Sequence, residues 1–180
     1  MTVMPHDRAW TVADLVDTPD DGFRYELCDG VLLVTGNPSN AHQIVVGELH
    51  LVLREGCPRE MRVMLAPTGY EPTERRSFQP DLLVAWRADV TDAPISAPLL
   101  LAIEVLSPST RSVDLVLKRA MYEESGVATY VVVDPLVPSV RAWQLQGGRY
   151  VEVGSAQGGA PLSLDHPFRV TLIPSELLDP

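Results

Sequence analysis

A carboxylate inside the most apolar stretch of the chain is the first sign of a chemical site. Glu104 lies within Leu99–Leu106 (LLLAIEVL), a run apolar enough to form a strand that is buried on both faces. An unpaired buried carboxylate is costly, so Glu104 needs a cation, a proton or a metal ion beside it. The sequence leaves two interpretations open, a metal-binding carboxylate and one half of a buried ion pair with Arg or Lys.

A second carboxylate stands at the start of another predicted strand. Asp81 follows Pro80 and begins the strand predicted for Asp81–Trp86. Pro-Asp is common turn chemistry, and Asp81 taken alone favours that interpretation. If this strand lies beside Leu99–Leu106, however, Asp81 and Glu104 meet. Two carboxylates make a site of hard oxygen ligands, which suits Mg²⁺ because this ion keeps several waters and accepts substrate phosphate.

The helix predicted for Arg111–Ser125 carries charged residues on an apolar arc. On a helical wheel this arc consists of Val113, Leu115, Leu117, Ala120, Met121 and Tyr122, and the opposite face consists of Ser112, Arg119 and Glu123. Lys118 and Asp114 fall within the apolar arc. A buried lysine is rare unless it is paired. Lys118 could stabilise charge on a phosphoryl oxygen, or it could form an ion pair with Asp114 one turn away, and both interpretations stay open.

Two further acids and a histidine lie in mixed surroundings. Glu26 alternates out of phase with its apolar neighbours on a predicted strand, so it points into a cleft or to water. Glu48 has apolar residues at its helical neighbour positions. Either acid could join a site, although a solvated carboxylate is the more ordinary interpretation. His42 is most simply a helix-start residue, and its distance from His50 does not match the HExxH spacing of a zinc protease.

Turn-forming residues separate these candidates into a mixed order of strands and helices. The predicted elements are a hairpin at 23–35, a helix at 41–55, strands at 62–66, 70–73 and 81–86, a loop at 88–98, a strand at 99–106, a helix at 111–125, a strand at 130–134, a hairpin of 140–145 with 149–153, a loop at 154–161 and a last strand at 168–173. This order predicts one α/β domain spanning residues 1–180, in which a mixed sheet is flanked by helices.

Composition limits the classes of protein that the chain can belong to. It has 180 residues, of which 46% are hydrophobic, and a net charge of −10. No apolar run reaches the roughly 18 residues of a membrane span, and no signal-peptide pattern is present, so we expect a cytoplasmic protein without a membrane partner. Cys28 and Cys57 form neither a disulfide framework nor a zinc motif. The acidic charge counts against a nucleic-acid substrate, although a metal ion can bridge an acidic site to phosphate.

Several motifs, taken in order, resemble one known family. They are Tyr25-Glu26-Leu27-Cys28-Asp29-Gly30, Pro38 with His42, Pro80-Asp81-Leu82, Glu104-Val105-Leu106-Ser107-Pro108-Ser109-Thr110, Asp114 with Lys118 and Tyr122, and Tyr130 with Val133-Asp134-Pro135. These residues resemble the Uma-two family of restriction endonucleases, within the PD-(D/E)xK nuclease superfamily. The likeness runs from Trp10 to about Tyr150, and the stretch from Glu104 to Tyr122 is its most specific part.

The resemblance implies a restriction-endonuclease-like core, a central mixed β-sheet flanked by helices, with additional N-terminal and C-terminal β-hairpins. It implies that Asp81 and Glu104, helped by the backbone carbonyl of Val105, hold a divalent metal ion. The expected ion is Mg²⁺, for which Mn²⁺ can substitute. Leu106 stands where the superfamily has its lysine, and the resemblance implies that Lys118 reaches the same point in space. Glu26 and His42 are possible additional site residues.

The expected function is therefore Mg²⁺-dependent hydrolysis of phosphodiester bonds by an endonuclease. Its partner would be nucleic acid, DNA before RNA, and a homodimer is a possible assembly. A catalytically silent nuclease fold that serves as a binding or assembly module is the alternative, favoured by the acidic charge and by Leu106. A third reading is a metal-dependent hydrolase for another phosphorylated substrate.

Overall fold

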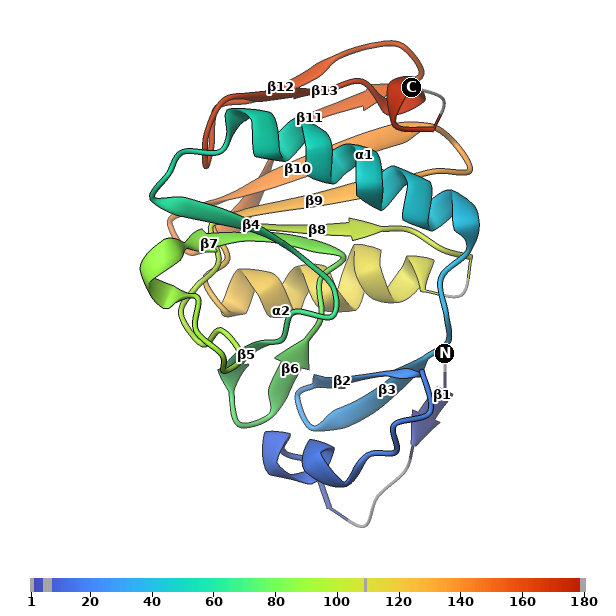
Figure 1. Cartoon of the computed structure of the whole chain (residues 1–180), viewed down its shortest axis with the longest axis vertical. Helices are drawn as coiled ribbons and strands as arrows, with labels where there is room; N and C mark the ends of the chain where they lie inside the picture. The colour runs from blue at the N-terminus through green and yellow to red at the C-terminus, as the bar shows by residue number, and fades with distance from the viewer. Residues whose placement is uncertain (1, 5–7, 109, 179–180) are drawn as a thin grey trace.

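A mixed six-stranded sheet forms the centre of the computed structural model, which describes residues 2–4, 8–108 and 110–178 (Figure 1). In spatial order the strands are β11 (Arg149–Gln157), β10 (Ser139–Gln146), β9 (Thr129–Asp134), β8 (Leu101–Val105), β7 (Leu82–Trp86) and β4 (Met61–Leu65). β8 and β9 are parallel, and the other neighbouring pairs are antiparallel. The predicted α/β class with a central mixed sheet is thereby confirmed.

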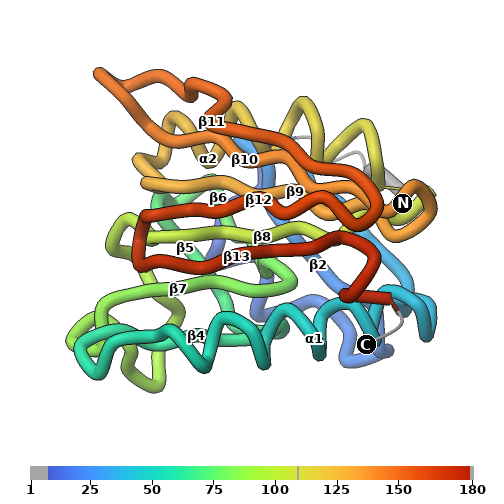
Figure 2. The backbone as a smooth tube through the Cα atoms, turned by 90° about the horizontal axis from the view of Figure 1, so that it is seen from above, coloured from blue at the N-terminus to red at the C-terminus, as the bar shows by residue number. Residues whose placement is uncertain are grey.

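Helices cover both faces of this sheet. α1 (Asn40–Gly56) lies on one face, and a π-helical turn, η3 (Val113–Lys118), continues into α2 (Arg119–Glu124) on the other (Figure 2). Residues of β8 alternate between the two cores: Ile103 packs on the α1 side, whereas Ala102 packs on the α2 side. Because side chains alternate along a strand, Glu104 also faces α2. Within the described residues, no helix is long and apolar enough to cross a membrane.

A second sheet, built mainly from the N-terminal part of the chain, lies near α2. Its order is β1 (Thr2–Met4), β3 (Val31–Thr35), β2 (Arg24–Cys28), β6 (Arg76–Phe78) and β5 (Tyr70–Thr73). Asp29 and Gly30 connect β2 to β3 with φ angles of 51° and 82°, as the predicted Asp-Gly hairpin requires. A Cβ on Gly30 would approach the Cβ of Ala9 to 2.8 Å, so the turn also needs glycine for space. This hairpin carries Glu26 to the central sheet.

The remaining elements close the other side of the molecule. A small antiparallel pair, β12 (Leu162–Leu164) and β13 (Val170–Leu172), lies beside α1 (Figure 1). Three short 3-10 helices complete the described chain, η1 (Val12–Asp17), η2 (Arg87–Asp89) and η4 (Pro174–Leu177). With the β10–β11 hairpin, β12 and β13 provide the additional C-terminal hairpins that the resemblance implies.

Some local predictions were wrong. β11 continues to Gln157, because its pairing with β10 extends through residues predicted as the loop 154–161. The short strands β1, β6 and β12 were not predicted. On the second helix Leu117 and Ala120 are exposed, although the wheel placed both on the buried arc. The side chains that turn inward follow a narrower stripe, Asp114, Lys118, Met121 and Tyr122, spaced four, three and one residues apart.

Candidate active site

Asp81 lies at the end of β7 that meets α1 and the N-terminal sheet. Leu82 pairs with Ile103, and continuing this register by one residue places Asp81 opposite Glu104. The carboxylate of Asp81 is buried, with 3% of the residue exposed. Its Oδ2 accepts hydrogen bonds from the Val105 backbone N–H at 2.9 Å and from His42 Nε2 at 3.0 Å, and its Oδ1 accepts one from Arg24 at 3.1 Å.

These partners keep Asp81 ionised despite its burial. Burial by itself raises the pKa of a carboxyl, but the hydrogen bond and charge of His42, the charge of Arg24 and the Val105 N–H together lower the pKa of Asp81 below its ordinary value. Because an ionised carboxylate only accepts hydrogen bonds, His42 donates through Nε2–H. The structure thus holds Asp81 as an anion in one orientation.

Glu104 occupies the adjoining position on β8 and contacts the second helix. Its Oε1 accepts hydrogen bonds from Lys118 Nζ at 3.0 Å and from the Tyr122 hydroxyl at 2.7 Å. Burial raises the pKa of Glu104 well above its ordinary value; the charge of Lys118 opposes this rise, and the nearby carboxylates Asp81, Asp114 and Glu26 add to it. The sequence required a cation, a proton or a metal ion beside Glu104, and the structure places a cation there, Lys118.

Lys118 is the only lysine in the chain and is almost completely buried. Its ammonium lies 3.0 Å from Glu104 and from Glu26, and 3.8 Å from Asp114. Burial lowers the pKa of a lysine, but the surrounding carboxylates, with Glu104 first, raise that of Lys118 well above its ordinary value. Lys118 thus pairs with Asp114 on its own helix and also points at the sheet, where it contacts Glu104.

The structure separates the remaining candidates. Glu26, 2% exposed, reaches the cluster from β2, where its Oε1 accepts from Lys118 and from the Gln79 backbone N–H at 2.8 Å. His42 stands in the first turn of α1, and its backbone N–H donates to Ser39, as expected of a helix start. Its side chain joins the cluster through Asp81. Glu48 is half-buried and lines a different cavity beside β13 and η4, so it lies apart.

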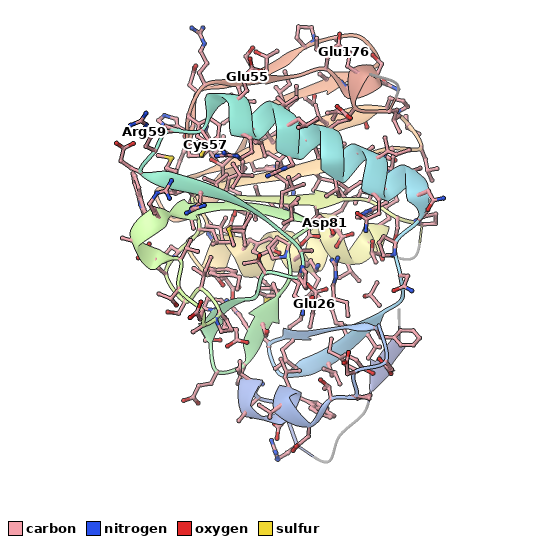
Figure 3. The ribbon with its side chains drawn as sticks, in the orientation of Figure 1. Glu26, Glu55, Cys57, Arg59, Asp81 and Glu176 are labelled. Carbon is pink, nitrogen blue, oxygen red and sulfur yellow. The ribbon has the colours of Figure 1, made fainter. Side chains whose placement is uncertain are left out.

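A cavity of about 230 Å³ opens over this cluster. Figure 3 shows its two sides, with Asp81 on the central sheet and Glu26 on the N-terminal hairpin that faces it. The cavity is lined by Arg24, Glu26, Thr35, Gly36, Asn37, Pro38, Ser39, His42, Asp81, Glu104, Val105, Ser107, Pro108, Thr110, Asp114 and Lys118. A second cavity of about 390 Å³ shares Arg24, Gly36, Asn37, Pro38, His42 and Asp81 with the first. The cluster is thus accessible to a small polar group.

Arg24 is the site residue that the sequence analysis missed. It stands two residues before Glu26 on β2, and residues two apart on a strand point to the same face, so this spacing could have indicated it. Burial lowers the pKa of an arginine, but the charges of Asp81, Glu26 and Glu104 raise that of Arg24. The helical wheel placed Tyr122 on the apolar arc, and only the family resemblance grouped it with Lys118; its hydroxyl donates to Glu104.

Comparison with known proteins places this arrangement in a family. The sequence matches the Uma2 family, described as “Putative restriction endonuclease”, over residues 12–174. The chain belongs to the Uma2 family. Its fold is similar to that of a crystal structure described as “a putative nuclease belonging to DUF820 from Anabaena variabilis ATCC 29413”, with 16% sequence identity, a TM-score of 0.72, and coverage of 93% of this chain and 97% of that one. No curated protein matches the sequence.

The charges of the Uma2 site fit a hard divalent cation. Four carboxyl groups, Glu26, Asp81, Glu104 and Asp114, are buried together with two cationic side chains, Arg24 and Lys118, so the acidic groups exceed the cations by two when His42 is left aside. Within the described residues, no three His, Cys, Asp or Glu side chains form a ready-made metal cage. Mg²⁺ does not need one, because it is commonly held by one or two carboxylates and waters. The donor chemistry of Asp81 and Glu104 therefore fits such an ion.

Replacing Glu104 by Gln should separate a metal ligand from a structural ion-pair partner. The amide can still accept from Lys118 and Tyr122, and the change removes one of the surplus negative charges. We expect the free energy of unfolding of the metal-free Glu104→Gln protein to lie within about 1 kcal/mol of that of the wild type, or to exceed it. Thermal melts in EDTA and in MgCl₂ measure this, and only the wild type should be stabilised by the metal. A large loss of stability in EDTA would instead identify Glu104 as a structural partner.

Proposed function

We propose that this Uma2 chain is a Mg²⁺-dependent endonuclease that hydrolyses phosphodiester bonds of DNA. The observation that carries the proposal is the convergence of Asp81, Glu104 and Lys118 on one cavity, where buried carboxylates outnumber permanent cations. The family description and the nuclease-like fold support it. The homodimer and the cytoplasmic location expected from the sequence stay predictions.

Asp81 and Glu104 are the proposed side-chain ligands, with the Val105 carbonyl as a backbone ligand. A divalent ion held by these residues would polarise the scissile phosphate and would lower the pKa of a bound water molecule. The protein residues prepare the site for this chemistry. The Val105 N–H and His42 fix the orientation of Asp81, and among the described residues both hydrogen bonds that Glu104 accepts end on Oε1. This leaves Oε2 of Glu104 as the oxygen for a metal.

Lys118 is the proposed charge-stabilising residue. Its ammonium is held at 3.0 Å from both Glu104 and Glu26, so its position is fixed before any substrate binds. A preorganised cation in a buried site stabilises negative charge that develops on a phosphoryl oxygen, and it can orient an attacking water. In the superfamily pattern a lysine stands at the position of Leu106. Lys118, which lies on a helix, would have the role of that lysine.

Metal-dependent cleavage of plasmid DNA by the purified protein tests the proposed function. Supercoiled plasmid should be converted to nicked and linear forms in MgCl₂ and should stay intact when EDTA replaces the metal. Agarose gels measure both reactions, and a labelled RNA of equal length tests the preference for DNA. Absence of metal-dependent cleavage of either nucleic acid would contradict the proposal and favour the binding or assembly module.

A further inference from the structure

Arg24 donates a hydrogen bond to the carboxylate oxygen of Asp81 that a metal ion would need. Oδ2 of Asp81 already accepts two hydrogen bonds, from Val105 and His42. Each carboxylate oxygen has about two acceptor positions, so Oδ2 is full. Among the described residues, Oδ1 accepts from Arg24 alone, at 3.1 Å. A metal ligated by Asp81 must therefore approach Oδ1, where the guanidinium lies, and two cations at one oxygen repel each other.

Arg24 is also the side chain of this cluster that can move most easily. Its side chain is 22% exposed, compared with 4% for Asp81 and 3% for Lys118. Besides Asp81, its guanidinium donates to the Gln79 backbone carbonyl at 3.1 Å, so few contacts hold it. It lines both cavities, at the boundary that they share. A guanidinium released there stands beside the space where a substrate phosphate would lie.

We propose that Arg24 holds Asp81 in the metal-free protein and, when a divalent metal binds, moves to bind a phosphate of the nucleic-acid backbone. The planar guanidinium suits this second partner, because it binds phosphate through two parallel hydrogen bonds. One side chain would then couple the two binding events: metal frees the guanidinium, and the phosphate keeps it away from Asp81. This inference rests on the proposed function, but its first test needs no catalysis.

Titration of the protein with MnCl₂ alone tests the competition for Asp81. Arg24→Gln keeps a donor for the Gln79 carbonyl and removes the charge, so it should bind Mn²⁺ about fivefold or more tightly than the wild type. The electron paramagnetic resonance signal of free Mn²⁺ measures the affinity. Arg75→Gln is the matched control, since it removes the same charge from the turn between β5 and β6, beside Asp29 at the far end of β2, and should bind Mn²⁺ like the wild type. Equal or weaker binding by Arg24→Gln would overturn the proposal.

Binding of a fluorescein-labelled DNA duplex in CaCl₂, measured by anisotropy, tests the phosphate contact. Arg24→Gln should bind the duplex about tenfold more weakly than Arg75→Gln. Arg24→Lys keeps the charge but loses the fork geometry, so it should bind Mn²⁺ like the wild type and DNA more weakly. Unchanged DNA affinity in both Arg24 variants would overturn the phosphate contact. If the wild type fails to cleave plasmid, the proposed function fails, while the Mn²⁺ titration still decides whether Arg24 competes for Asp81.

Discussion

Replacement of Lys118 by Met should reduce DNA cleavage by about a hundredfold or more and should also destabilise the fold. The cleavage loss follows because a preorganised cation facing the reacting phosphate is removed. The stability loss follows because Glu26, Glu104 and Asp114 all direct carboxylates at this ammonium. Removing one partner from a buried ion pair typically costs about 3–5 kcal/mol. Urea unfolding measures the second effect, and plasmid nicking well below the melting temperature of the variant measures the first.

Arg119→Met provides the matched control for Lys118. The two residues are neighbours, and both substitutions remove one positive charge, but Arg119 lies 5.4 Å from the ring centroid of Trp143 outside the cavity. Its loss should leave cleavage near that of the wild type and should cost no more than about 1 kcal/mol. Because Lys118 is the only lysine, its slow reaction with an amine-specific reagent, followed by mass spectrometry, checks its burial directly. Equal cleavage by the two variants would exclude Lys118 as the displaced catalytic lysine.

Asp81→Asn should abolish metal-dependent cleavage, with a loss of about a hundredfold or more. The amide has one acceptor oxygen, so it can accept from Val105 and His42 or from Arg24, but not from all three as the carboxylate does. The variant also lacks the negative charge that a hard cation requires. Stabilisation by MgCl₂ in a thermal melt should disappear together with nicking of plasmid DNA.

The buried Asp134 of β9 supplies a control of the same chemical type. It also pairs with an arginine, Arg111, and accepts the backbone N–H groups of Leu136 and Val137, but it does not line the cavity. Asp134→Asn should lower stability without removing the response to MgCl₂. If Asp134→Asn and Asp81→Asn lose cleavage to the same extent, the effect would reflect general damage to the fold and not a metal site at Asp81.

The local patterns of the sequence predicted the elements that carry the site. Gly and Pro marked the ends of the predicted helix that corresponds to α1, and Asp29-Gly30 marked the turn of the hairpin formed by β2 and β3. The apolar run around Glu104 predicted a buried strand, and β8 is buried at every residue. Such patterns can be recognised in the sequence because turn formation and hydrophobic periodicity depend on residues that are close in the chain. The length of β11 was mispredicted because pairing with β10 overrode its polar, glycine-containing sequence.

The sequence by itself therefore determined that Glu104 had to be compensated and that Asp81 and Lys118 were candidates to share its site. It did not determine whether Glu26 points into the site or to water. The alternation of polar and apolar residues along a hairpin strand is the same whether its polar face lies in a cleft or in solvent. Only the tertiary structure brought Glu26 to Lys118, 92 positions apart in the chain, and Arg24 to Asp81, 57 positions apart. These pairs depend on how the N-terminal sheet packs against the central one. That packing arises from contacts distant in sequence, and so these two ion pairs leave no local pattern, unlike the pair of Lys118 with Asp114 one turn away.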